Sequence, residues 1–116
     1  MQQKKLTQNL NSLKKNEKSI YYFIIFFFSF SVNLFYGYRG IFPIDSFLIY
    51  ESGYKILNGF HPFKDYWSIT GPLLDYIQFI FFSLFDVNWF SYVLHSTVIN
   101  TFLATFIYYF FNKIGL

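Results

Sequence analysis

Long apolar runs alternate with polar stretches along the chain, and their borders predict its helices. Residues 20–38 form the first run, which is long enough to cross about 30 Å of hydrocarbon as one α-helix. Residues 72–85 and 89–111 form two more runs, joined by the turn-forming residues Asp86-Val87-Asn88. The pattern predicts an all-α membrane protein whose three transmembrane helices cross out, back in, and out again.

The second run is the weakest span by length, because residues 72–85 would make a helix of only about 21 Å. An interfacial helix or a core helix is the alternative for this run. Pro72 suits a first helical position, where its missing N–H costs nothing, and the tight turn into residues 89–111 favours a helical hairpin. Tyr and Trp side chains near both ends of residues 89–111 are typical of a full span.

The polar segment 39–71 contains one more predicted helix, at residues 43–58, which Pro43 opens and Gly59 ends. One side of this helix would hold four apolar or aromatic side chains, those of Phe47, Tyr50, Tyr54 and Leu57. A separate side would hold polar residues, among which Glu51 and Lys55 have favourable i,i+4 spacing. The pattern predicts an amphipathic juxtamembrane helix with its aromatic side against the membrane. Asp45 falls on a different face, shared with Ile49, Ser52 and Ile56.

The distribution of charge predicts the orientation of the chain. Residues 1–19 contain five lysines and one acid, whereas residues 39–71 contain three bases and three acids. The positive-inside rule therefore predicts that residues 1–19 are a basic cytoplasmic tail and that residues 39–71 are an extracytoplasmic loop. Binding of nucleic acid is not indicated, because the basic tail lacks Arg and interleaved aromatic residues. The first apolar run is too long for a signal-peptide h-region and precedes no small-x-small cleavage pattern, which favours an uncleaved anchor.

Composition excludes several other classes. Hydrophobic residues make up 54% of the 116 residues and aromatic residues 28%, which leaves too little polar surface for a small soluble domain. The chain has no Cys, so it has neither disulfides nor Cys-based zinc sites. His61 has no Cys, His or acid at ligand spacing, and the sequence indicates no metal and no cofactor.

Between the first and second runs, several short motifs follow one another in a fixed order. Asp45 is followed by a short helix ending at Asn58-Gly59, then by Pro62-Phe63-Lys64-Asp65-Tyr66, and then by Gly71-Pro72-Leu73-Leu74. This order resembles the N-terminal part of GT-C-type polytopic glycosyltransferases, including bacterial relatives of dolichyl-phosphate-mannose–protein mannosyltransferases and of aminoarabinose transferases. The resemblance covers roughly residues 20–100. The sequence departs from it at Ser46, where many relatives have Glu, and at Gly71, where many have Pro.

The resemblance implies an enzyme of the bacterial inner (plasma) membrane, with a cytoplasmic N-terminus, that moves a sugar from a polyprenyl-phosphate donor to an extracytoplasmic acceptor. Asp45 would be the catalytic base, and Asp65, Arg39 and Asp75 would be substrate-binding residues. Each has an ordinary alternative. Asp45 would cap its helix, and Asp65 would belong to an ordinary loop. Arg39 would anchor in lipid headgroups. Asp75 would lie near a helix start, where the helix dipole and the membrane interface lower the free-energy cost of its charge.

The last apolar run has a polar stripe that predicts helix packing. Its small and hydroxylated residues share one face, as is typical of helix contacts in lipid: Ser96, Thr97, Asn100, Thr101 and Ala104. His95 lies on another face, and no acid in the same helix supports a proton relay there. Three helices cannot enclose a donor site, so we expect an N-terminal segment that is inactive alone and needs further transmembrane helices. The alternative is a small non-catalytic membrane protein that assembles with partner helices.

Overall fold

The computed structural model describes the backbone of residues 2–40 and 43–115, and the side chains of residues 17–40 and 45–115. Four helices follow one another, α1 (Gln2–Gly37), α2 (Pro43–Leu57), α3 (Pro72–Phe85) and α4 (Trp89–Ile114). Within the described residues, β pairing is limited to one isolated bridge between Pro62 and Tyr66. The predicted all-α class is confirmed for this part of the chain.

The helix borders agree with the predicted ones to within one residue, apart from two larger differences. α1 begins at Gln2, so the basic segment predicted as a tail is helical and continuous with the first apolar run. α4 continues to Ile114, three residues past the predicted end at residue 111. Two helical segments are long and apolar enough to cross a membrane, Glu17–Gly37 and Trp89–Ile114. α3, with 14 residues, is shorter than these, and a third span stays a prediction.

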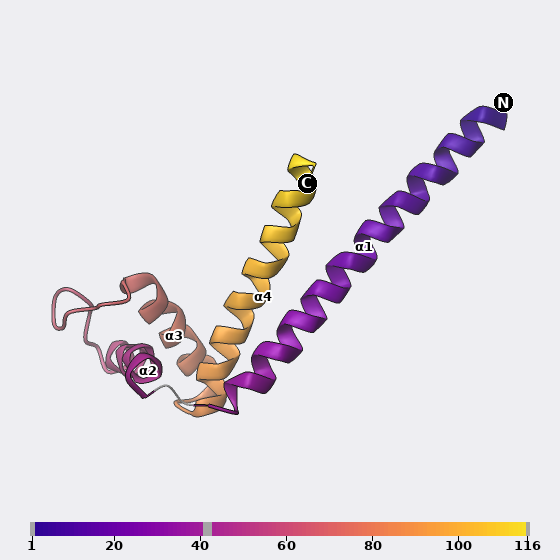
Figure 1. Cartoon of the computed structure of the whole chain (residues 1–116). Helices are drawn as coiled ribbons and strands as arrows, with labels where there is room; N and C mark the ends of the chain where they lie inside the picture. The colour runs from indigo at the N-terminus through magenta and orange to yellow at the C-terminus, as the bar shows by residue number, and fades with distance from the viewer. Residues whose placement is uncertain (1, 41–42, 116) are drawn as a thin grey trace.

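α1 and α4 pack side by side and run in opposite directions (Figure 1). Near one end, the indole Nε1 of Trp89 donates a hydrogen bond to the carbonyl oxygen of Gly37, at 3.1 Å. Farther along, the Asn100 amide donates to the Asn33 side-chain oxygen at 2.8 Å. The end of α1 therefore meets the start of α4, and the two helices form an antiparallel hairpin.

This hairpin does not agree with the expected order of out, back in, and out again. In three successive crossings the first and third spans run in the same direction, whereas α1 and α4 run in opposite directions. The reason is local: the Asp86-Val87-Asn88 turn lies beside the end of α1, where Trp89 bonds to Gly37. An antiparallel pair is the arrangement expected of two consecutive spans, if both helices cross a membrane.

The polar stripe of α4 does form a packing face, and its partner is within this chain. Thr97 and Thr101 are buried, and Asn100 bonds to Asn33 of α1. Thr101 shares a small apolar cavity with Phe26 and Phe30 of α1. The stripe therefore contacts α1 and does not by itself require a missing helix.

α2 packs against α3 through a face that repeats every three to four residues. Asp75, Gln78 and Phe82 of α3 are all buried. The ring of Phe82 meets the ring of Tyr50 edge-on, with centroids 4.8 Å apart. At Gly53 an added Cβ would lie only 2.5 Å from Cγ of Gln78, so the close helix approach requires a glycine there.

This packing changes the expected amphipathic helix in one respect. Tyr50 turns toward Phe82 and leaves the predicted aromatic side, whereas Phe47, Tyr54 and Leu57 remain exposed. The cause is that α2 covers α3, so the helix has a protein-facing side as well as an outward apolar side. The ammonium of Lys55 lies 2.8 Å from the Glu51 carboxylate, which confirms the i,i+4 pair.

Candidate functional site

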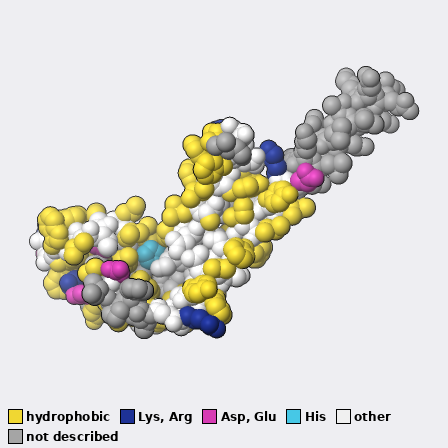
Figure 2. Space-filling model, in the orientation of Figure 1, with side chains coloured by type: hydrophobic (Ala, Val, Ile, Leu, Met, Phe, Trp, Pro, Cys, Tyr) yellow, Lys and Arg dark blue, Asp and Glu magenta, His cyan; other side chains and the backbone are white. Residues whose placement is uncertain are grey.

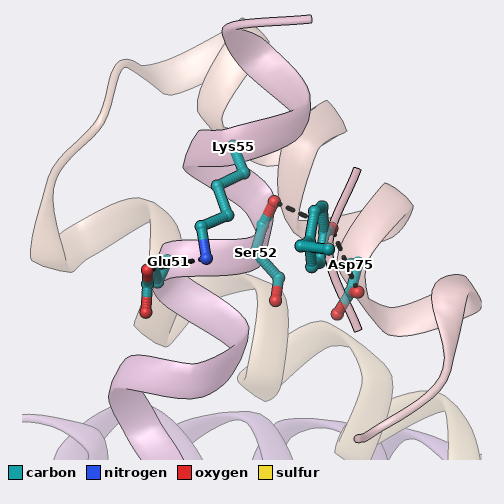
Figure 3. A network of polar contacts seen from close by, with 5 residues as sticks. Glu51, Ser52, Lys55 and Asp75 are labelled. Atoms are coloured by element: carbon teal, nitrogen blue, oxygen red, sulfur yellow. Dashed lines mark hydrogen bonds and ion pairs between the residues drawn. The ribbon is translucent and has the colours of Figure 1, made fainter. Parts of the chain in front are cut away.

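A buried carboxylate lies where α2, α3 and the connecting loop meet. Asp75, in the first turn of α3, has no exposed surface. Its two oxygens accept hydrogen bonds from the Tyr66 hydroxyl and from the Thr70 hydroxyl, both at 3.3 Å. Figure 3 shows this carboxylate near Ser52 of α2, with the Glu51–Lys55 pair on the far side of Ser52. The start of a helix favours a negative charge, and the two hydroxyl donors replace part of the water that burial removes.

Tyr66 links this carboxylate to α2. Its hydroxyl also lies 3.4 Å from the Ser52 carbonyl oxygen, and the Lys55 ammonium lies 5.1 Å from the centre of its ring. Burial, and next the negative charge of Asp75, raise the pKa of Tyr66 to about 12. At neutral pH the side chain is therefore a protonated donor, which suits a structural bond to Asp75.

Asp45 lies apart from this cluster. It is in the first turn of α2 and its side chain is exposed. Within the described residues its carboxylate makes neither an ion pair nor a hydrogen bond. The exposed position leaves both carboxylate oxygens available to a substrate, and no described contact joins Asp45 to Asp75.

Asp65 and Arg39 have local partners. Oδ2 of Asp65 accepts a hydrogen bond from the backbone N–H of His61 at 2.8 Å, which holds the loop in a tight turn. The Arg39 guanidinium lies 4.3 Å from the centre of the Phe35 ring. It is exposed and stands at one end of an open groove of about 540 Å³ whose other walls come from α1 and the residues after it. The structure therefore does not gather the four predicted site residues into one pocket.

A second buried polar contact joins α3 to α4. Nδ1 of His95 lies 2.7 Å from Oε1 of Gln78, and both side chains are buried. Within the described residues, Nε2 of each has no hydrogen-bond partner. Sequence reasoning considered His95 without its partner, because Gln78 is 17 residues away on a different helix. The spacing of Asp75, Gln78 and Phe82 places them on one face of α3, and this pattern could have indicated that Gln78 is buried and available as a partner for His95.

No group of three His, Asp or Glu side chains lies close enough to hold a metal ion in the part of the chain that the structure describes. Comparison of the chain with protein-family models, with curated proteins and with solved structures finds no match. The candidate site therefore rests on its own geometry.

Proposed function

We propose that the chain is an integral membrane protein with two consecutive spans, α1 and α4, and that α2, α3 and the connecting loop lie outside the cytoplasm. The support is the antiparallel hairpin, with most large apolar side chains of both helices exposed. Figure 2 shows these side chains along the visible face of the hairpin. With two spans, Lys113 near the end of α4 lies on the same side as the lysines of residues 1–19, which fits the positive-inside rule.

We further propose that this hairpin is the N-terminal segment of a membrane glycosyltransferase that uses a polyprenyl-phosphate sugar. The observation that supports it is the exposed Asp45 carboxylate in the first turn of α2, which has no bonding partner among the described residues. In the proposed orientation it lies on the extracytoplasmic side, where the resemblance places the acceptor. Its nearest competitor, Asp75, is buried and already bonded to two hydroxyl groups. Asp45 is therefore the better base, and Asp75 is a positioning residue.

In the proposed reaction, the Asp45 carboxylate takes the proton of an acceptor hydroxyl. The acceptor oxygen then forms a bond to the anomeric carbon of the sugar, and the bond from that carbon to the phosphate oxygen breaks. The polyprenyl phosphate leaves with the electron pair. Arg39, exposed at the end of α1 with an apolar groove beside it, suits the charged phosphate and the start of the lipid tail.

Two spans do not surround a donor, so the proposal includes further transmembrane helices that complete the site. The second candidate function is a non-catalytic membrane protein that assembles with partner helices. The observation in its favour is the outer face of α1, where Phe23, Phe27 and Phe28 are 60% exposed or more and no described helix covers them.

The test is Asp45→Asn, introduced into the native gene, with sugar transfer from a radiolabelled polyprenyl-phosphate sugar measured in isolated membranes. Asn keeps the size and the capping ability of Asp, so protein abundance should stay normal, while loss of a general base lowers the rate by about 10²–10⁴-fold. Asp86→Asn is the matched control, because Asp86 is also an exposed acid and has no proposed role. Wild-type transfer by the Asp45→Asn protein would refute the catalytic assignment and favour the second candidate.

A further inference from the structure

The loop between α2 and α3 exposes more apolar surface than its polar sequence suggests. Trp67 is 80% exposed and Ile69 75%, and Leu73, at the start of α3, is 71% exposed. These are the three most exposed large hydrophobic residues in the part of the chain that the structure describes. Phe60 and Phe63 are more than half exposed. We call these five residues the loop edge: Phe60, Phe63, Trp67, Ile69 and Leu73.

The backbone that presents the loop edge is held by its own hydrogen bonds. The N–H of Phe63 donates to the Tyr66 carbonyl oxygen at 2.7 Å, and the N–H of Asp65 donates to the His61 carbonyl oxygen at 2.9 Å. Tyr66 also bonds inward to Asp75. The part of the loop from His61 to Tyr66 is therefore a defined turn, and the exposure of Phe63 does not result from an irregular chain.

The conformation of Phe63 is the strongest local indication that the loop edge has a function. Its φ is 65°, in the left-handed region that a bulky side chain rarely adopts. This conformation places the Phe63 ring edge-on against the Trp67 ring, with centroids 5.4 Å apart. Backbone strain of this kind persists where the surrounding structure enforces it and is concentrated at functional positions. Here it keeps two exposed aromatic rings together on one surface.

The side chains of the loop edge indicate its partner. Figure 1 shows the loop to the side of the hairpin, beyond α2 and α3 from the end where α1 ends and α4 begins. At that same end Tyr36 and Tyr38 are exposed, as in the aromatic belt of a membrane-spanning helix. The loop edge exposes apolar and aromatic side chains of the same kind, and the exposed Lys64 beside Phe63 adds a cation of the kind that favours lipid headgroups.

We propose that the loop edge inserts into the headgroup region of the outer surface of the membrane that the hairpin crosses. This inference rests on the proposed two-span arrangement. Its consequence is that the α2–α3 unit is held against the bilayer at two places, by the hairpin and by the loop edge. Asp45 and Arg39 would then both stand close to the lipid surface, where a polyprenyl-phosphate head is found.

The two Trp residues of the chain make the test direct. The Trp89→Phe protein reports on Trp67 alone, and the Trp67→Phe protein reports on Trp89 alone. Each full-length variant is reconstituted in phosphatidylcholine vesicles with and without bromine on the acyl chains near the headgroup. We expect loss of Trp67 emission in the brominated vesicles, with little loss on adding aqueous acrylamide.

The possible outcomes distinguish failure of the loop-edge proposal from failure of the two-span arrangement on which it rests. Quenching of Trp89 by bromine without quenching of Trp67 would leave the hairpin in the membrane and overturn the loop-edge proposal. Quenching of neither would overturn both. Trp67 emission that is protected only in native membranes, and not in vesicles, would show a protein partner in place of lipid and would also overturn the proposal.

A second probe leaves the hydrogen bond between Trp89 and Gly37 in place. The chain has no native Cys, so Ile69→Cys carries a single bimane label while both Trp residues stay in place. Loss of bimane emission in the brominated vesicles supports insertion of the loop edge. Unchanged bimane emission, together with quenching of Trp89 in the Trp67→Phe protein, would overturn it.

Discussion

The indole of Trp89 donates a hydrogen bond to the carbonyl oxygen of Gly37, across 52 residues of sequence and at a distance of 3.1 Å. Gly37 is the last residue of α1, and the last carbonyl groups of a helix have no partner within it. Trp89 supplies that partner from the first residue of α4. One side chain thereby completes the end of one proposed span and fixes the start of the other.

The same junction predicts the effect of a methyl group at position 37. A Cβ at Gly37 would lie 2.5 Å from Cγ1 of Val93, so Gly37→Ala should lower the free energy of unfolding by about 1–3 kcal/mol through overpacking. Val93→Ala removes the side-chain atoms in the way, and the double variant should recover much of the loss. The measurement is unfolding by SDS in mixed micelles, followed by circular dichroism.

Gly53 provides the contrasting control. A Cβ there would lie 2.5 Å from Cγ, 2.9 Å from Cβ and 3.3 Å from the backbone carbon of Gln78. Gln78→Ala keeps the Cβ and the backbone atom, so it should not rescue Gly53→Ala. Rescue at position 53 but not at position 37 would contradict the described packing of both helix pairs.

Two spans and three spans differ in the position of the end of α4. Single cysteines at Ser12, Lys64 and Lys113 can be labelled with a membrane-impermeant maleimide, since the chain has no Cys of its own. We expect labelling of Lys64→Cys in intact cells, and of Ser12→Cys and Lys113→Cys only after lysis. Labelling of Lys113→Cys in intact cells would support three crossings and contradict the antiparallel pair of spans.

The sequence predicted local features of the fold well and long-range ones less well. Pro72 and the Asp86-Val87-Asn88 turn set the ends of α3 by local rules, and both positions were correct. The direction of α4 relative to α1 depends on Gly37 with Trp89, a contact between distant residues that no local pattern reveals. The same holds at the site, where the burial of Asp75 follows from Tyr66 and Thr70 folding back over the start of α3.

The Tyr66–Asp75 bond predicts a loss of stability at high pH. Burial and the Asp75 charge raise the pKa of Tyr66 from 10.0 to about 12, so between these values the unfolded chain loses a proton that the folded protein keeps. The stabilisation is complete below pH 10 and is lost as pH rises through the folded pKa. Melting temperatures from pH 9 upward should fall more steeply for the wild type than for Tyr66→Phe.

Asp75→Asn separates the two causes of that shift. It removes the negative charge but leaves Tyr66 partly buried, so the pKa of Tyr66 should fall and still stay above its ordinary value. Because burial is the largest single cause, part of the shift should remain. Ultraviolet titration of tyrosinate, taken as a difference from the Tyr66→Phe protein, measures this, and a return to the ordinary pKa would show that charge is the main cause.

Asp86 offers a stabilising substitution. Its φ of 65° and ψ of 167° lie in a region that is essentially restricted to glycine and costs other residues about 1–3 kcal/mol. Asp86→Gly removes this strain, and the added freedom of glycine in the unfolded chain offsets about 0.5–1 kcal/mol. The carbonyl of residue 86 would still accept from the Ser91 hydroxyl. We expect a net gain of about 1 kcal/mol in the SDS titration, and a loss would refute strain at this turn.

The Asn33–Asn100 bond bears on how the protein is made. A ribosome completes Asn33 when its partner is still 67 residues away, so α1 would enter the membrane with a polar amide and no second helix. The Asn33 amide already donates to the Ser29 carbonyl oxygen at 2.8 Å within α1, which satisfies it during that delay. Its side-chain oxygen then waits for α4. A first helix that is self-sufficient on synthesis and still selects its neighbour later suits stepwise insertion, one segment at a time.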